Sequence, residues 1–155
     1  MDSVQAAETV REDSAVPPSG AFIWPVRVYY EDTDSSGVVY YANYLKFMER
    51  ARTEWLRALG FELAALGREQ RLVLVVTRLA VDYRKPARLG DLLAVRVRPL
   101  TCRRASFELV QDVGRGSLED ELLCHGQVRI ACLDADTFRP RSIPPYIASE
   151  LTRER

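Results

Sequence analysis

Two carboxylates separated by one residue form the part of the chain most suited to chemistry. Asp32 and Asp34 lie in the segment YYEDTDSSGVVYYANY, residues 29–44, directly before a helical pattern that is largely apolar. The first N–H groups of a helix have no partner inside it, and the helix dipole makes that end partially positive. A thioester carbonyl resting on such N–H groups would be stabilised as it becomes an oxyanion. A neighbouring carboxylate could then attack the carbonyl or take a proton from an attacking water.

The same residue types also occur in calcium loops and in simple turns. Counted from Asp32, the segment has the D-x-D-x-x-G spacing of a calcium loop, but its twelfth position is Asn43, where a bidentate glutamate is needed, so an EF-hand fails. Aspartate, serine and glycine also favour turns whatever the function, and spacing alone does not separate a turn from an active site. Asp34, three residues before Gly37, is well placed for the chemical role.

Common hydrolase and metal signatures do not occur. The chain has no GxSxG elbow, P-loop or dinucleotide glycine motif, and one histidine cannot build a multi-histidine zinc site. That histidine, His125, falls on the polar face of the last predicted strand, where we expect a surface or interface role. We interpret Cys102, Cys124 and Cys132, which lack CxxC spacing, as reduced thiols packed on strands of a cytoplasmic protein. Neither a metal nor a redox cofactor is expected.

Composition limits the class of protein. The chain has 155 residues, of which 47% are apolar and 28% charged, as in one globular domain with a core of its own. Its 22 basic and 22 acidic residues give a net charge of zero, which argues against a nucleic-acid partner. No apolar run approaches the roughly 20 residues of a membrane helix. Residues 1–20 are expected to be a flexible tail, and residues 21–155 a single domain.

The periodicity predicts which elements position the aspartates. After a strand over residues 22–30, apolar residues at three- and four-residue steps predict a long helix over residues 42–59, ended by Gly60, and a short helical turn over 62–68. Alternation then predicts strands over residues 72–83, 92–100, 106–113 and 121–133, before a short C-terminal helix. This order indicates an α+β fold with an antiparallel sheet on one helix. Because residues 72–76 are apolar on both faces, we expect self-association.

At this point the residues match a known family. The chain resembles the 4-hydroxybenzoyl-CoA thioesterase-like branch of the hot-dog superfamily, in particular its Tol–Pal-associated acyl-CoA thioesterases. The likeness is carried by WPVRVYYEDTD, GVVYY, NY and ERARTE, which begin at residues 24, 37, 43 and 49, and it extends over residues 22–148. It implies a hot-dog fold, a central helix wrapped by a curved antiparallel sheet. It also implies a homodimer or homotetramer with interface active sites, acting on an acyl-CoA or an acyl-carrier protein.

The resemblance assigns roles to residues of the first motif. Asp34 is the catalytic carboxylate, as nucleophile or general base, and the backbone N–H of Tyr41 polarises the thioester carbonyl. Gly37 allows the turn between them, and Asp32 is expected to hold the turn rather than to react. Some relatives carry a histidine at the Tyr41 position, so the departure leaves a role for the tyrosine side chain open.

A basic segment supplies the expected coenzyme A contacts. Arg103 and Arg104 resemble the residues that hold the coenzyme A phosphates, and adjacent guanidinium groups suit phosphate oxygens. Neighbours on a strand face opposite sides, so both can reach one ligand only if the strand ends or bulges there; otherwise they are two solvated arginines. Asn43 and Ser106 complete the expected substrate-binding set. Coenzyme A is part of the substrate, and no separate cofactor is required.

One alternative belongs to another functional class. A non-catalytic acyl-CoA or acyl-carrier binding module could use the same fold. Retention of Asp34 before an intact Gly37 turn argues against it, because binding alone needs no carboxylate beside a thioester. A hot-dog dehydratase is weaker, since His125 is not placed to serve as its active-site histidine. The cations Arg84, Lys85 and Arg88 could attract an anionic ligand or only be solvated.

Overall fold

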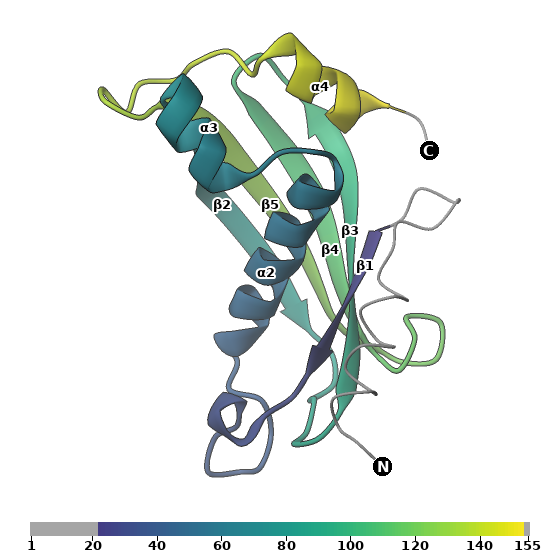
Figure 1. Cartoon of the computed structure of the whole chain (residues 1–155). Helices are drawn as coiled ribbons and strands as arrows, with labels where there is room; N and C mark the ends of the chain where they lie inside the picture. Colours follow the sequence, from purple (N-terminus) through teal and green to yellow (C-terminus); the bar gives the residue numbers. More distant parts are fainter. Residues whose placement is uncertain (1–21, 154–155) are drawn as a thin grey trace.

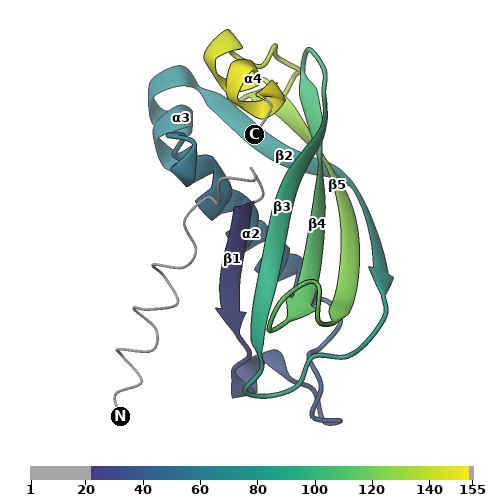
Figure 2. The same ribbon diagram turned by 90° about the vertical axis from the view of Figure 1, so that its right-hand side faces the viewer.

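A long helix, α2 (Asn43–Ala58), packs on one face of a single curved sheet (Figures 1 and 2). This arrangement comes from a computed structural model that describes residues 22–153, so the tail predicted at residues 1–20 lies outside the described part. The strands are β1 Phe22–Arg27, β2 Leu72–Tyr83, β3 Leu92–Cys102, β4 Ser106–Arg115 and β5 Leu122–Asp134. They lie in the spatial order β1-β3-β4-β5-β2, with every neighbouring pair antiparallel. The predicted α+β fold is confirmed.

Helix α2 is one residue shorter at each end than the predicted helix over residues 42–59. Its buried residues recur at the predicted steps and are Tyr44, Phe47, Met48, Ala51, Trp55 and Leu56. At its end, the Gly60 N–H donates to the Arg57 carbonyl and the Phe61 N–H donates to the Leu56 carbonyl. These two bonds form a Schellman motif, which Gly60 completes with a φ of +96° that favours glycine.

Two shorter helices cover one end of the sheet in Figure 1. These are α3 (Leu63–Gln70) and α4 (Pro145–Thr152), which correspond to the helical turn and the C-terminal helix predicted from the sequence. The Ile147 and Leu151 side chains of α4 are buried in the same core as α2. Within residues 22–153, no helix combines the length and the apolar character that crossing a bilayer would require.

The inner face of the sheet is apolar and meets α2. Alternate residues of β4 and β5 point to this face and are buried: Phe107, Leu109, Val113, Cys124, Val128 and Ile130. Gly126 permits the close approach of the helix, because a Cβ at this position would lie 2.9 Å from Met48 Cε. Helix and sheet therefore share one tightly packed core.

The outer face of the sheet carries a charged row across three strands. The register aligns Arg96 of β3, Asp112 of β4 and His125 of β5. The Asp112 carboxylate is buried and contacts both the Arg96 guanidinium and His125 Nδ1. His125 thus lies on the polar face as predicted, but it is joined to a buried aspartate instead of being simply solvated.

Strand β2 forms a long edge of the sheet. Leu72 is buried, whereas Val76 and Leu79 expose 44% and 37% of their surface. A long edge strand with exposed apolar side chains is a template for pairing with another chain. Self-association of this strand stays a prediction.

The first strand is shorter than predicted. β1 ends at Arg27 instead of continuing to residue 30, and a 3-10 turn, η1 (Tyr30–Asp32), follows. Strand pairing stops here because the Asp32 carboxylate accepts the Tyr29 N–H at 2.8 Å, which bends the chain. Val28 keeps two further links, donating its N–H to the Asp91 carbonyl at 2.9 Å and accepting the Gly90 N–H at 3.0 Å. Because β1 ends early, Asp32 and Asp34 lie in a loop and not on the strand.

Candidate active site

Asp32 closes the turn that follows β1. Its carboxylate accepts the Tyr29 N–H at 2.8 Å, and its carbonyl accepts the Tyr40 N–H at 3.0 Å. One residue therefore links the start of the loop to the approach of α2. The prediction that Asp32 holds the turn is confirmed.

Asp34 begins a tight hairpin at the tip of the loop. Its N–H donates to the Val38 carbonyl at 2.9 Å, and its carbonyl accepts the Gly37 N–H at 3.1 Å. Gly37 has a φ of +79°, in the left-handed region where glycine is favoured, as the predicted turn requires. The Asp34 side chain is exposed, and Oδ1 accepts the Ser36 N–H at 2.8 Å. Its Oδ2 has no partner among the described residues and is available for chemistry.

The hairpin is fastened to the connection between β2 and β3. The Val39 N–H donates to the Ala87 carbonyl at 2.9 Å, and the Ala87 N–H donates to the Tyr44 hydroxyl at 2.9 Å. Tyr44 lies in the first turn of α2 and is buried. Burial raises the pKa of this hydroxyl, so it remains a neutral acceptor. The loop and the helix start are thereby held together through Ala87.

Tyr41 stands two residues before the start of α2 and offers a free N–H. Within residues 22–153 this N–H has no acceptor, whereas the Tyr41 carbonyl accepts a hydrogen bond of 2.8 Å from the Tyr83 hydroxyl. The Tyr41 side chain is 62% exposed. A fixed N–H without a partner, at the positive end of a helix, is suited to stabilising a developing oxyanion.

Asn43 is engaged within the loop. Its amide Nδ2 donates to the Asp32 carbonyl at 2.8 Å, while its backbone N–H donates to the Tyr40 carbonyl at 2.8 Å. The first residue of α2 therefore holds the turn that carries the aspartates. This contact gives Asn43 a positioning role in the folded chain, besides the substrate contact expected from the sequence.

A hollow of about 250 Å³ opens at the helix start, and we call it the Tyr41 pocket. It is lined by Val39, Tyr41, Tyr44, Tyr83, Arg84, Lys85 and Pro86. Arg84 and Lys85, for which the sequence leaves open anion binding or simple solvation, are exposed at this pocket, and Lys85 Nζ lies 3.7 Å from Glu121. Burial raises the pKa of the Tyr83 hydroxyl, which stays protonated and able to donate to Tyr41.

The predicted phosphate-binding residues lie at the other end of the sheet. Arg103 and Arg104 follow the last residue of β3, and Ser106 begins β4. The strand therefore ends at the two arginines, which is the condition for both side chains to reach one ligand. The Asp34 loop follows β1 at the opposite end, where Arg27 pairs with Leu92 (Figures 1 and 2). β3 spans 11 residues, which separates the two groups by about 33 Å. One chain does not bring them together.

Two polar residues outside the predicted set meet beneath α2. Arg52 Nη1 donates to Gln111 Oε1 at 2.9 Å, and Gln111 Nε2 donates to the Met48 carbonyl at 2.9 Å. Gln111 is fully buried. Its signal is present in the sequence, because it interrupts an otherwise apolar row, Phe107, Leu109 and Val113, on the inward side of β4.

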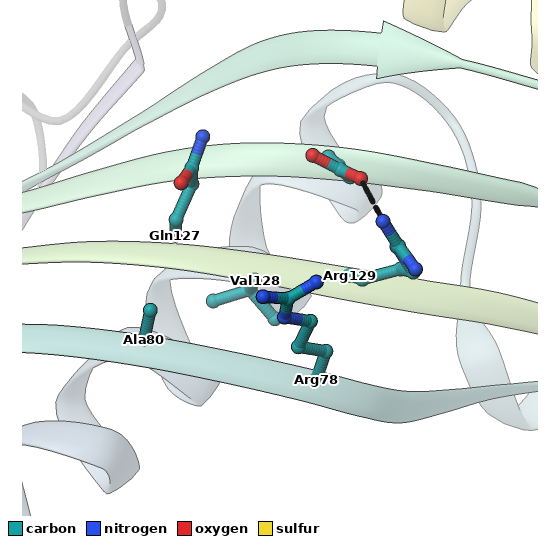
Figure 3. Close-up of a pocket in the computed structure, with 6 residues that line it drawn as sticks. Arg78, Ala80, Gln127, Val128 and Arg129 are labelled. Carbon is teal, nitrogen blue, oxygen red and sulfur yellow. Dashed lines mark hydrogen bonds and ion pairs between the residues drawn. The ribbon is translucent and has the colours of Figure 1, made fainter.

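A further hollow, of about 160 Å³, lies on the outer face of the sheet (Figure 3). Arg78 and Arg129 project from the neighbouring strands β2 and β5 at this hollow, and Arg129 donates to Glu108 at 2.8 and 3.0 Å. It faces away from α2, so the sheet separates it from the Tyr41 pocket.

The cysteines offer no second nucleophile. Cys102, Cys124 and Cys132 are free thiols on strands, as predicted. Burial raises the pKa of Cys124 to about 12, which keeps it a neutral thiol.

The fold and the site define a class of protein. A central helix packed on a curved antiparallel sheet is the fold of the hot-dog thioesterases. The chain belongs to the thioesterase-like superfamily, whose family model matches residues 28–151. The resemblance seen in the sequence is therefore confirmed.

Similar proteins support this assignment. The acyl-CoA thioester hydrolase YbgC of Escherichia coli O6:H1 is 43% identical over 129 residues, covering 83% of this chain and 94% of that protein. The acyl-CoA thioesterase YbgC of Haemophilus influenzae is 46% identical over 126 residues, covering 81% and 90%. A probable thioesterase from Bartonella henselae is 35% identical with a TM-score of 0.74, covering 80% and 99%. A 1,4-dihydroxy-2-naphthoyl-CoA thioesterase from Synechocystis, 23% identical, shares the fold with a TM-score of 0.78 over 85% and 96%.

Proposed function

We propose that this protein is an acyl-CoA thioesterase that hydrolyses its substrate to a free acid and a thiol. The observation that carries the proposal is the hairpin of Asp34, fastened to the start of α2, where the Tyr41 N–H has no partner among the described residues. Similarity to proteins named acyl-CoA thioesterases supports the choice of substrate.

In this mechanism the thioester carbonyl accepts a hydrogen bond from the Tyr41 N–H, which stabilises the oxyanion as it forms. As nucleophile, an Asp34 oxygen adds to the carbonyl carbon, the C–S bond breaks, and coenzyme A leaves as a thiolate. Water then hydrolyses the resulting anhydride. As general base, Asp34 takes a proton from a water whose oxygen adds to the same carbon. Both routes release the acid and the thiol.

The active enzyme in this proposal is a homodimer. Asp34 is exposed in a single chain, and the arginines of the β3–β4 turn lie at the other end of the sheet. Antiparallel pairing of two β2 edges about a two-fold axis would carry the second copy's β3–β4 turn to the end where Asp34 lies. Arg103 and Arg104 would then hold the coenzyme A phosphates from across the interface. Pairing of two dimers into a homotetramer belongs to the same proposal.

The setting of the enzyme is inferred in the same way. Its free thiols fit a reducing cytoplasm. Family resemblance extends the proposal in two ways. The enzyme would be associated with the Tol–Pal system, and it would also accept acyl groups carried by an acyl-carrier protein.

The central test measures release of coenzyme A thiol from a panel of aliphatic and aromatic acyl-CoAs. Asp34→Asn keeps the size of the side chain and should lower kcat at least 100-fold, while acyl-CoA binding remains. Asp120→Asn, an exposed turn aspartate in the β4–β5 connection, serves as the matched control and should retain full activity. A wild-type protein that binds acyl-CoA but releases no thiol would leave only the binding-module alternative.

Mixing two defective variants tests the shared site. One variant carries Asp34→Asn, and the other carries Arg103→Ala together with Arg104→Ala. In this proposal each variant alone is inactive. Hybrid dimers regain one intact site, so random mixing should restore up to about a quarter of wild-type activity. Mixtures that stay inactive would show that catalytic and phosphate-binding residues act within one chain.

A further inference from the structure

A groove runs along the seam between α2 and the edge strand β2. It has a volume of about 210 Å³ and apolar walls of Leu45, Met48, Val76, Leu79 and Val128. Its charged lining residues are Lys46, Glu49 and Arg52, all from α2. We call this hollow the seam groove.

The seam groove and the Tyr41 pocket are both lined by residues of α2 and of β2. On the helix side, Leu45, Met48 and Arg52 follow one another at steps of three and four residues, which is one row of the α2 surface, and Tyr41 stands just before the start of this helix. On the strand side, Tyr83 lines the Tyr41 pocket, and Leu79 and Val76 line the seam groove. An acyl group whose carbonyl rests on the Tyr41 N–H would therefore extend along this row.

The row also gives the length of acyl group that the groove accommodates. Nine residue steps of helix separate Asn43, the first residue of α2, from Arg52, a rise of about 14 Å, and Tyr41 lies two residues before that start. Helical side chains point back toward the N-terminus, so the guanidinium lies nearer, about 10 Å from the carbonyl position. Arg52 thus stands at the far end of the space that the acyl group would fill.

Arg52 is a cation held in position by an uncharged side chain. Within residues 22–153 no ion pair joins it to an acid, and its hydrogen bond goes to the fully buried Gln111. Glu49, on the turn before Arg52, is exposed and Lys46 is exposed as well, so the lining carries two cations and one carboxylate. Burial lowers the pKa of the Arg52 guanidinium, an effect that Glu49 partly offsets, and the group stays charged.

Such an arrangement stabilises an anionic ligand group. A partly desolvated guanidinium without a counter-ion is costly for the free protein, and a carboxylate bound there would relieve that cost through charge-assisted hydrogen bonds. Gln111, anchored to the Met48 carbonyl, restricts how Arg52 can turn and therefore where that carboxylate would lie.

We propose that Arg52 is a specificity-determining residue at the far end of the acyl site, and that it selects acyl groups bearing a terminal carboxylate about 10 Å from the thioester. The substrates of this class are the coenzyme A monothioesters of medium-length dicarboxylic acids. The proposal rests on the proposed function, because the position of the carbonyl at Tyr41 sets the direction of the acyl group.

Binding of thioether analogues tests the selection without requiring turnover. Three S-alkyl coenzyme A compounds of equal chain length, ending in a carboxylate, a hydroxyl or a methyl group, are titrated by calorimetry. The wild type should bind the carboxylate about 10- to 100-fold more tightly than the methyl compound, with the hydroxyl between them. Arg52→Gln, which keeps a donor for Gln111, should abolish the preference, and Arg52→Lys should retain part of it. Arg50→Gln, an exposed arginine two residues earlier, is the control and should bind as the wild type does.

Three results would overturn the proposal. The first is equal affinity of the wild type for all three compounds, and the second is a preference for the carboxylate that survives Arg52→Gln. The third is a sedimentation result in which the Arg52→Gln variant is a smaller oligomer than the wild type. The last would assign Arg52 to contact with a second copy. Thiol release from the matching thioesters separates the two proposals: selective binding without hydrolysis would refute the thioesterase but keep the Arg52 site.

Discussion

The Tyr83 hydroxyl donates a hydrogen bond of 2.8 Å to the Tyr41 carbonyl, which joins the last residue of β2 to the residue just before α2 whose N–H has no acceptor within residues 22–153. The Tyr41–Ala42 peptide, which follows the N–H that would polarise the thioester, is therefore held from the edge strand. If two copies pair along β2, that pairing would also affect the geometry of the peptide between Tyr41 and Ala42.

Removal of the Tyr83 hydroxyl should lower kcat more than it changes KM. Tyr83→Phe keeps the ring, which lies 6.4 Å from the Tyr41 ring, and deletes only the donor. Loss of one hydrogen bond is worth about 1 kcal/mol, so we expect a fall in kcat of about fivefold. Tyr146→Phe removes a hydroxyl bonded to Gln70 on α3 and should leave the kinetics unchanged. Equal effects of the two substitutions would contradict a role of Tyr83 at the reaction centre.

The Asp34 hairpin depends on the backbone of Gly37. At a φ of +79° an alanine is strained by about 1–2 kcal/mol, and Gly37→Ala should lower both stability and activity. Space is not the cause, because a Cβ at Gly37 would have no atom within 4 Å. Gly67→Ala provides a matched control in the interior of α3, where a Cβ is equally free and the substitution should raise stability by about 0.5–1 kcal/mol. Thermal unfolding and thiol-release rates of both variants, compared with the wild type, measure these effects on stability and activity.

Local patterns predict most of the fold, because they depend on neighbouring residues. The steps of three and four that indicate α2, and the alternation that indicates β5, are properties of short segments. The same patterns place the end of β1 three residues too late, since a single side-chain bond from Asp32 ends it. No local pattern reports such a bond.

The arrangement of the site depends on contacts between distant segments. The turn at Asp34 and Gly37 can be predicted from residue types, whereas the separation of Arg103 from Asp34 follows from the length and direction of β3. The bond from Asn43 to the Asp32 carbonyl joins residues 11 apart and has no signature in sequence. Gln111 does leave a signal, as a polar residue on an apolar row, but its partner Arg52 lies 59 residues away.

Gln111 and Arg52 should show energetic coupling in unfolding experiments. Gln111→Leu fits the apolar row but removes the acceptor of a half-buried guanidinium, so we expect a loss of about 1–3 kcal/mol. Adding Arg52→Met should recover part of this loss, because the unsatisfied charge is then absent. Gln127→Leu, on the exposed outer row of β5, is the control and should change stability by less than about 0.5 kcal/mol. Strictly additive losses in the double variant would mean that the two side chains do not interact in solution.

Stability should depend on acid through Asp112. Burial alone would raise the pKa of this carboxyl, but hydrogen bonds from Arg96 and His125 outweigh it and hold the pKa below its usual value. A carboxyl whose pKa is lower in the folded than in the unfolded chain stabilises the fold above the unfolded value, about 3.9. That stabilisation is lost as the pH falls from about 4 through the folded pKa.

Urea unfolding of wild type and Asp112→Asn between pH 7 and pH 3 measures this contribution. At pH 7 the variant should be less stable by about 3 kcal/mol, because Arg96 loses its buried counter-ion. Toward pH 3 the two free energies of unfolding should converge, since protonation removes the same charge from the wild type. Asp120→Asn, in an exposed turn, should follow the wild-type curve throughout. If the Asp112→Asn curve instead runs parallel to the wild type at every pH, the cluster of Arg96, Asp112 and His125 stabilises the sheet by packing and not by charge.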